Sequence, residues 1–142
     1  MFAVSDKKIL WLIYTVLLGM VPIFMRLIVA NLVNGERIPV VAASDFISLG
    51  IVIHISVLAE IRYSDTHGAT WKQAVTGVTV LALIFYSVLY AASVFSEVSN
   101  EVNTSGILWS SMFMAVVSFL VSLVVYDRLA YAPEAPVEVA ND

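Results

Sequence analysis

The chain has 142 residues, of which 61% are hydrophobic and only 13% are charged, and its mean hydropathy is +0.94. A soluble domain usually carries about 25% charged residues, so this composition predicts a membrane protein. The absence of cysteine excludes disulfides, thiolate catalysis and cysteine-ligated metal sites. Two histidines leave few ways to build a transition-metal site, and a net charge of −4 offers no broad basic surface for nucleic acid.

Four apolar segments are long enough to cross a bilayer, which takes about 20 predominantly apolar residues. In chain order they cover residues 9–33, 44–61, 73–95 and 107–126, with turn-forming residues between them. We therefore expect an all-α integral membrane protein with an up-down bundle of four transmembrane helices. This single domain should span residues 1–131, and an acidic, proline-containing segment over 132–142 is expected to be a flexible tail.

The distribution of basic residues predicts the orientation, because Lys and Arg are enriched on the cytoplasmic side of membrane proteins. With the N-terminus inside, Arg37 faces outward and five basic residues face the cytoplasm: Lys7, Lys8, Arg62, Lys72 and Arg128. Both termini should therefore lie in the cytoplasm, and we expect the bacterial inner membrane. The first apolar run is far longer than the core of about 7–15 residues in a signal peptide, so we interpret it as a retained span.

The first span carries a face of small and polar residues. Thr15, Gly19, Pro22 and Arg26 recur at helical spacing, and Pro22 predicts a kink because it has no amide hydrogen to donate. An arginine at the bilayer centre costs about 2.5–3.5 kcal/mol, less if it reaches the interface or a partner. Asp45 is the nearest acid in the predicted topology. An Arg26–Asp45 pair would have one of two roles. As a structural ion pair it would orient the first two helices, and as a functional one it would gate the outer mouth of a path through the membrane.

The second span has polar residues on two opposite sides. At about 100° per residue, Asp45, Ser48, Ser56 and Glu60 share one face, whereas His54 lies opposite. We expect one flank to pack inside the protomer and the other to meet a neighbouring subunit or a water-filled axis. This predicts a homo-oligomer, with a tetramer as the best single number. His54 is either part of an ion path or a neutral imidazole bonded to a serine or a backbone carbonyl.

The fourth span repeats the spacing of small residues at Ser111, Ala115, Ser118 and Ser122. Small residues allow helix backbones to approach closely in lipid, where no hydrophobic force drives helices together. We interpret this stripe, with Gly19 and Pro22 of the first span, as a helix-packing surface.

Residues near the predicted span ends suggest where a partner would dock. Aromatic and arginine side chains commonly anchor protein interfaces, and the cytoplasmic side offers Arg62, Tyr63, His67, Trp71, Lys72 and Arg128. The alternative interpretation is an aromatic belt at the membrane interface. It would consist of Trp11, Tyr63, Trp71, Trp109, Tyr126 and Tyr131.

The sequence contains no HExxH, GxSxG or glycine-rich phosphate loop, so we expect a protein that is not an enzyme and binds no cofactor, metal or nucleic acid. The leading hypothesis is an oligomeric membrane anchor or sensor subunit that docks a cytoplasmic protein. Its setting would be a bacterial membrane-associated complex such as a phage-defence system. The alternative is a proton- or cation-coupled transporter or channel, formed by several copies and using Arg26, Asp45, His54 and Glu60.

The predicted orientation can be tested with single cysteines at Ser5, Ser99 and Val139, because the natural chain has none. An impermeant thiol reagent on intact cells should label the cysteine at Ser99 only. Labelling at Ser5 or Val139 would contradict a topology with both termini inside.

Overall fold

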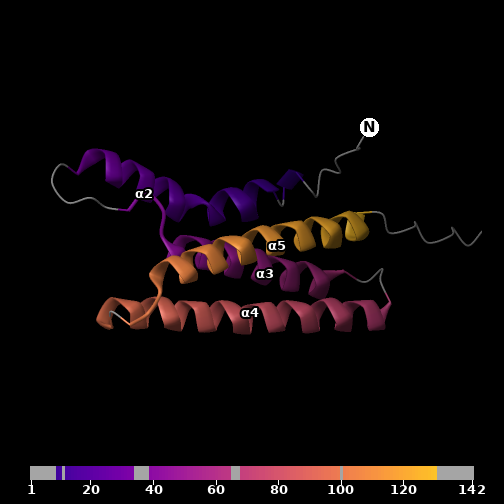
Figure 1. Ribbon diagram of the computed structural model, residues 1–142. Helices are drawn as coiled ribbons and strands as arrows, with labels where there is room; N and C mark the ends of the chain where they lie inside the picture. The colour runs from indigo at the N-terminus through magenta and orange to yellow at the C-terminus, as the bar shows by residue number, and fades with distance from the viewer. Residues whose placement is uncertain (1–8, 11, 34–38, 65–67, 100, 131–142) are drawn as a thin grey trace, which may run out of the picture.

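The structure, a computed structural model, describes residues 9–10, 12–33, 39–64, 68–99 and 101–130. All regular elements in this part of the chain are helices (Figure 1). They are a π-helical segment η1 (Leu12–Leu17), α2 (Val21–Leu32), α3 (Ala43–Tyr63), α4 (Ala69–Val98) and α5 (Thr104–Ala130). The predicted tail over 132–142 lies outside the described residues, as do Trp11 and Tyr131 of the predicted aromatic belt.

Four helical segments are long and apolar enough to cross a membrane, as predicted: Ile13–Leu32, Ala43–Tyr63, Ala69–Val98 and Thr104–Leu129. The helices α4 and α5 extend beyond the predicted apolar runs at both ends. Hydropathy marks the part of a helix that suits hydrocarbon, whereas the helix itself continues for as long as its backbone hydrogen bonds are satisfied. Polar residues such as Lys72 therefore belong to α4.

The first span is interrupted at Met20, which separates η1 from α2. The Met20 amide donates to the carbonyl oxygens of Val16 (2.9 Å) and Leu17 (3.2 Å). Pro22 then lies in the first turn of α2, where a missing amide hydrogen costs no intrahelical bond. The interruption at Met20 lies between Leu18 and Pro22, where the proline predicted a kink.

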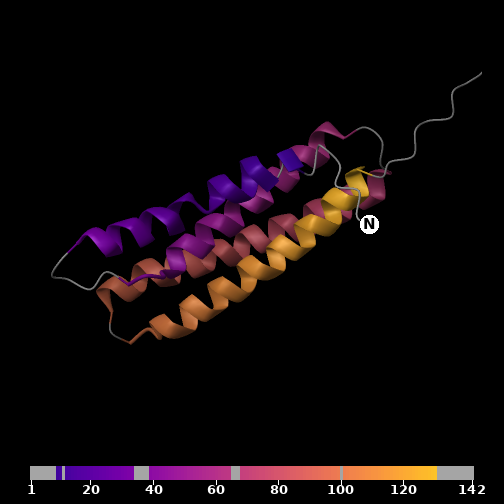
Figure 2. The same ribbon diagram turned by 90° about the horizontal axis from the view of Figure 1, so that it is seen from above.

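The central helix of the bundle is α3, which packs against α4, α5 and the first span (Figures 1 and 2). Its buried residues occur along its whole length: Asp45, Ile47, Gly50, Ile53, His54, Val57 and Ile61. The first span packs mainly against α3, and α2 has no buried residue. Three helices therefore form the body of the bundle, and the first span is added to one side of α3.

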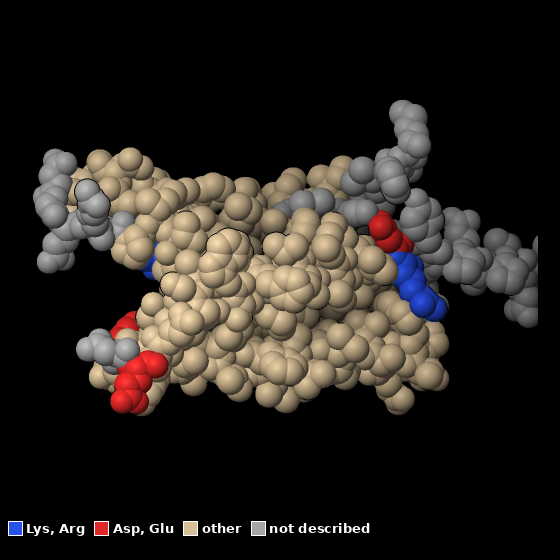
Figure 3. Space-filling model, in the orientation of Figure 1, with Lys and Arg blue, Asp and Glu red and all other residues tan. Residues whose placement is uncertain are grey.

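The outer surface of the bundle is apolar over its middle. Large hydrophobic side chains are exposed on every spanning helix, among them Phe24, Ile55, Phe85 and Phe113. On the face seen in Figure 3, the charged side chains lie towards the two ends of the molecule, and the band between them carries almost none. Such a surface suits lipid, because exposed apolar patches of this extent are not found on soluble monomers.

Gly50 brings α4 close to α3. The phenol ring of Tyr86, which is fully buried, occupies the space where a Cβ atom at Gly50 would stand. Any side chain at this position would therefore overlap Tyr86. Gly77 of α4 provides a contrast, since a Cβ atom there would meet no described atom within 4 Å.

We predict that Gly50→Ala destabilises the bundle by about 1–3 kcal/mol, the usual cost of overpacking a tight core. The matched variant Gly77→Ala should be neutral or slightly stabilising, because alanine favours helices by about 1 kcal/mol over glycine. The measurement is the temperature at which each purified variant loses its monodisperse elution peak in mild detergent. Equal melting of the two variants would contradict this packing.

Candidate functional site

Arg26 and Asp45 form an ion pair that connects α2 to the first turn of α3. The Arg26 Nε atom donates to Asp45 Oδ2 at 2.6 Å, and an Nη2 hydrogen reaches Oδ1 at 3.3 Å. The carboxylate side chain is 7% exposed and the guanidinium side chain 26%. Asp45 also gains from its place near the N-terminus of α3, where the helix dipole favours negative charge. The predicted contact is confirmed.

A second polar contact joins three helices on the same side of α3. Thr15 Oγ1 of η1 lies 2.8 Å from Ser56 Oγ of α3, and that oxygen lies 3.2 Å from the Tyr126 hydroxyl of α5. Tyr126 is only 5% exposed and packs in the core with Val57 and Ile61. Its predicted place in an aromatic belt is therefore wrong, because its hydroxyl finds a partner inside the protein.

The opposite side of α3 carries a buried centre of three side chains, His54, Tyr86 and Ser118. Both His54 Nε2 and the Tyr86 hydroxyl lie 2.9 Å from Ser118 Oγ, and the two rings are tilted with centroids 5.9 Å apart. These side chains come from α3, α4 and α5. The centre therefore fixes the mutual rotation of the three helices that form the body of the bundle.

The contacts of His54 favour a neutral ring with its proton on Nε2. His54 is 4% exposed, and its Nδ1 atom is buried without a hydrogen-bond partner. A serine oxygen can accept two hydrogen bonds, so Ser118 can accept from both His54 and Tyr86. A proton on Nδ1 would leave a buried N–H donor unsatisfied, which is rare and costly. The serine-bonded imidazole foreseen from the sequence is the arrangement found.

Helices of the same chain cover Asp45 and His54, the buried polar residues on the two flanks of α3, whereas Ser48 is exposed and donates to a carbonyl oxygen of its own helix. The face with Asp45 and Ser56 lies against the first span, and His54 lies between α4 and α5. The expectation that one flank needs a neighbouring subunit or a water-filled axis is therefore wrong. The Ser118 hydroxyl and the tilted Tyr86 ring cover His54 within the protomer, so the tetramer stays a prediction without this support.

The stripe of small residues in α5 is a helix-packing surface. Ser111, Ala115, Ser118 and Ser122 are all buried. The hydroxyls of Ser111 and Ser122 donate within α5, to carbonyl oxygens of residues 107 and 119 at 2.7 Å each. In the first span Gly19 is buried, and a Cβ atom there would lie 2.8 Å from Leu49 Cδ1. Pro22 is exposed and takes no part in this packing.

The residues expected to bind a partner lie where α3 and α5 end and α4 begins. Arg62 and Tyr63 are exposed. The Arg128 guanidinium carbon lies 5.0 Å from the centroid of the Trp71 ring, and the Lys72 ammonium donates to the carbonyl oxygen of Ser64. His67 lies outside the described residues. Glu60, half-buried near the end of α3, lies one turn before Ser64 and apart from the Arg26–Asp45 pair.

The four intramembrane polar residues therefore do not form one site. Arg26 and Asp45 pair on one side of α3, His54 lies on the other, and Glu60 lies towards the far end of the helix. Among the described residues, no three His, Asp or Glu side chains come together as a metal site. Tyr86 was not foreseen from the sequence; the available signal was a tyrosine near the middle of a span, where its hydroxyl needs a partner.

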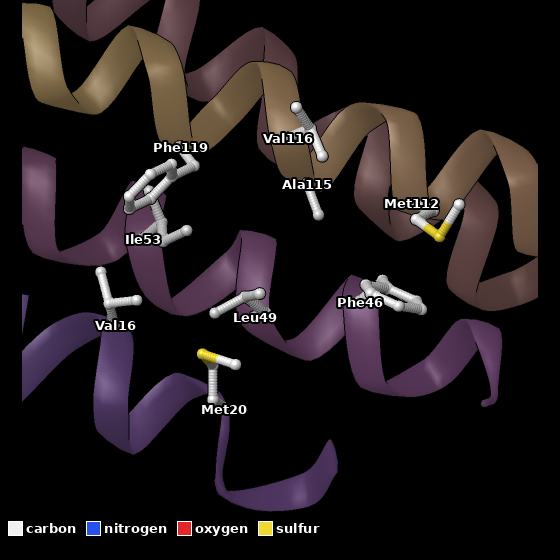
Figure 4. A pocket seen from close by; sticks show the side chains of 9 residues that line it. All are labelled: Val16, Met20, Phe46, Leu49, Ile53, Met112, Ala115, Val116 and Phe119. Carbon is white, nitrogen blue, oxygen red and sulfur yellow. The ribbon is translucent and has the colours of Figure 1, made fainter. Parts of the chain in front are cut away.

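An apolar groove of about 230 Å³ lies between the first span, α3 and α5 (Figure 4). Its side chains are entirely hydrocarbon and thioether. They are Val16, Met20, Phe46, Leu49, Ile53, Met112, Ala115, Val116 and Phe119. The groove lies where the first span packs mainly against α3 rather than against α5. It offers no polar group with which to recognise a ligand.

No protein-family model, curated protein sequence or solved structure matches this chain.

We predict that Arg26→Glu prevents normal folding, because it places two carboxylates together in the membrane. Breaking a buried ion pair by removing one partner costs about 3–5 kcal/mol. The exchange variant Arg26→Asp with Asp45→Arg should recover part of the folded yield, although arginine is less suited than aspartate to the N-terminus of α3. Yield and monodispersity after membrane extraction provide the measurement. Wild-type yield from Arg26→Glu would mean that Arg26 simply reaches the interface.

Proposed function

We propose that this chain is a non-enzymatic membrane anchor or sensor subunit that docks a cytoplasmic protein. The docking surface would be the basic end of the bundle, which we define as Arg62, Tyr63, Trp71, Lys72 and Arg128. The observation that carries this proposal is a difference in location between two groups of polar side chains. Those inside the bundle contact one another across helix interfaces, whereas Arg62 and Tyr63 project from its end.

The proposed orientation is an up-down bundle in the bacterial inner membrane with both termini in the cytoplasm. Three cations, Arg62, Lys72 and Arg128, occupy the ends of α3, α4 and α5 that meet at the basic end. Two acids, Glu97 and Glu101, lie at the opposite end, where α4 ends and α5 is about to begin. This asymmetry supports a cytoplasmic basic end, because positive charge is retained inside.

A sensing role has support in the attachment of the first span. Its polar links to the body are the Arg26–Asp45 pair and the Thr15–Ser56 contact, and the apolar groove separates it from the middle of α5. A change in the membrane or in an outer ligand could shift this helix while α3, α4 and α5 keep their packing. By analogy of architecture alone, the proposed setting is a bacterial membrane-associated complex such as a phage-defence system.

Docking can be tested with a photo-crosslinking amino acid placed at Tyr63 in cells of the native host. The matched control is Val98, because Tyr63 is 81% exposed and Val98 is 82% exposed at the opposite end of the bundle. We expect Tyr63 to yield an adduct with one cytoplasmic protein, identified by mass spectrometry. The second change Arg62→Glu should weaken that adduct at least several-fold.

Two results would contradict the proposal. The first is the same adduct, or none, at both positions. The second is pH-dependent cation flux in proteoliposomes containing the purified chain, lost in His54→Gln while assembly is retained. That pattern belongs to the competing transporter or channel function, in which His54 carries protons or lines an ion path.

A further inference from the structure

A second groove lies between α4 and α5 at the basic end and has a cation at its mouth. It encloses about 280 Å³ and is lined by Trp71, Val75, Val121, Val124, Val125 and Arg128. Along α5 the lining residues recur every three or four positions, so they form one stripe. From Arg128 to Val121 this stripe runs about 10 Å along the helix axis, at 1.5 Å per residue.

The two ends of this groove differ in chemistry. Val75, Val121, Val124 and Val125 form an apolar wall in the membrane-spanning part of α4 and α5. The mouth carries Arg128, which is exposed and lies over the ring of Trp71. The guanidinium group of arginine carries a planar set of N–H donors that suits phosphate oxygens. Tryptophan is the side chain that favours the headgroup level of a bilayer.

We propose that this groove binds an anionic phospholipid, with its phosphate at Arg128 and an acyl chain along the valines. The inference goes beyond the proposed docking function and does not depend on it. Basic pockets between transmembrane helices are a known means of holding acidic lipid headgroups. Lys72, in the same turn of α4 as Trp71, adds a second positive charge near the mouth. The acids Glu60 and Asp127 lie at the same end of the bundle, but neither lines the groove.

The presence of a charged side chain distinguishes this groove from the apolar groove of Figure 4 as a site that can select its ligand. The groove at the first span contains no polar side chain, so nothing in it selects one hydrophobic occupant over another. The Arg128 groove combines a cation with an apolar valine wall, which matches the two parts of one lipid molecule. A second copy of the chain would match the valines but would bring no phosphate group to Arg128.

The test is native mass spectrometry of the purified full chain in mild detergent, titrated with phosphatidylglycerol or with phosphatidylcholine of the same acyl chains. We expect the anionic lipid to bind more tightly. Arg128→Gln should reduce its affinity about fivefold, the effect of one basic residue near an acidic membrane surface. Val121→Phe should reduce binding of the anionic lipid by obstructing the groove.

Two matched control variants distinguish loss of this site from the general effects of removing a positive charge or adding a bulky side chain. Arg62→Gln removes another exposed arginine at the same end, and Val117→Phe adds the same bulk one turn earlier, outside the groove. Val117 and Val121 are 38% and 40% exposed, so neither change enters the core. Both controls should bind the anionic lipid like wild type. Equal affinity for the two lipids, or equal losses in test and control variants, would overturn the proposal. So would groove variants that change the number of subunits without changing lipid binding.

Discussion

The arrangement of this bundle depends on one constraint: polar side chains within the membrane must find partners inside the protein, because hydrocarbon offers none. The central helix α3 carries polar residues on two opposite sides, and a polar side chain on each side, Asp45 and His54, is buried against other helices of the chain. Its Asp45 and Ser56 are satisfied by the first span, and its His54 by α5, with the Tyr86 ring of α4 against it. The position of α3 between the other helices follows from this requirement.

The polar contacts also differ in how strictly they fix the rotation of the helices against one another. The Arg26–Asp45 pair joins a charge of α2 to a charge in the first turn of α3, and charge attraction tolerates a range of helix rotations. The His54–Ser118–Tyr86 centre is more demanding, since three short side chains must meet at one oxygen atom. Gly50 allows this meeting by giving the Tyr86 ring the space beside α3. Register among α3, α4 and α5 therefore depends on a polar centre and a glycine together.

Sequence reasoning found the features that depend on the residues of a single helix, such as its hydropathy or the cost of one charge in the membrane. Hydropathy located the four spans, Pro22 located the break, and the cost of a lone arginine pointed to Asp45. It failed where the answer depends on how helices rotate against one another. The sequence placed His54 opposite Asp45 but could not say which helix covers either flank, because periodicity gives the angle between residues on α3 and not the neighbour on each side. Tyr126 was assigned to the interface because its position near a span end was visible, whereas its bond to Ser56 was not.

The same constraint bears on function. A transport path needs polar groups that stay accessible and can exchange partners, whereas the ones inside this bundle are engaged in holding helices together. His54 has a single hydrogen-bonded nitrogen and a second nitrogen enclosed by the core. A charged ring would need a partner for that second nitrogen, which would require α3, α4 or α5 to move. The polar residues inside the bundle therefore favour helix packing over an ion path, and the docking and lipid binding that we propose concern the basic end instead.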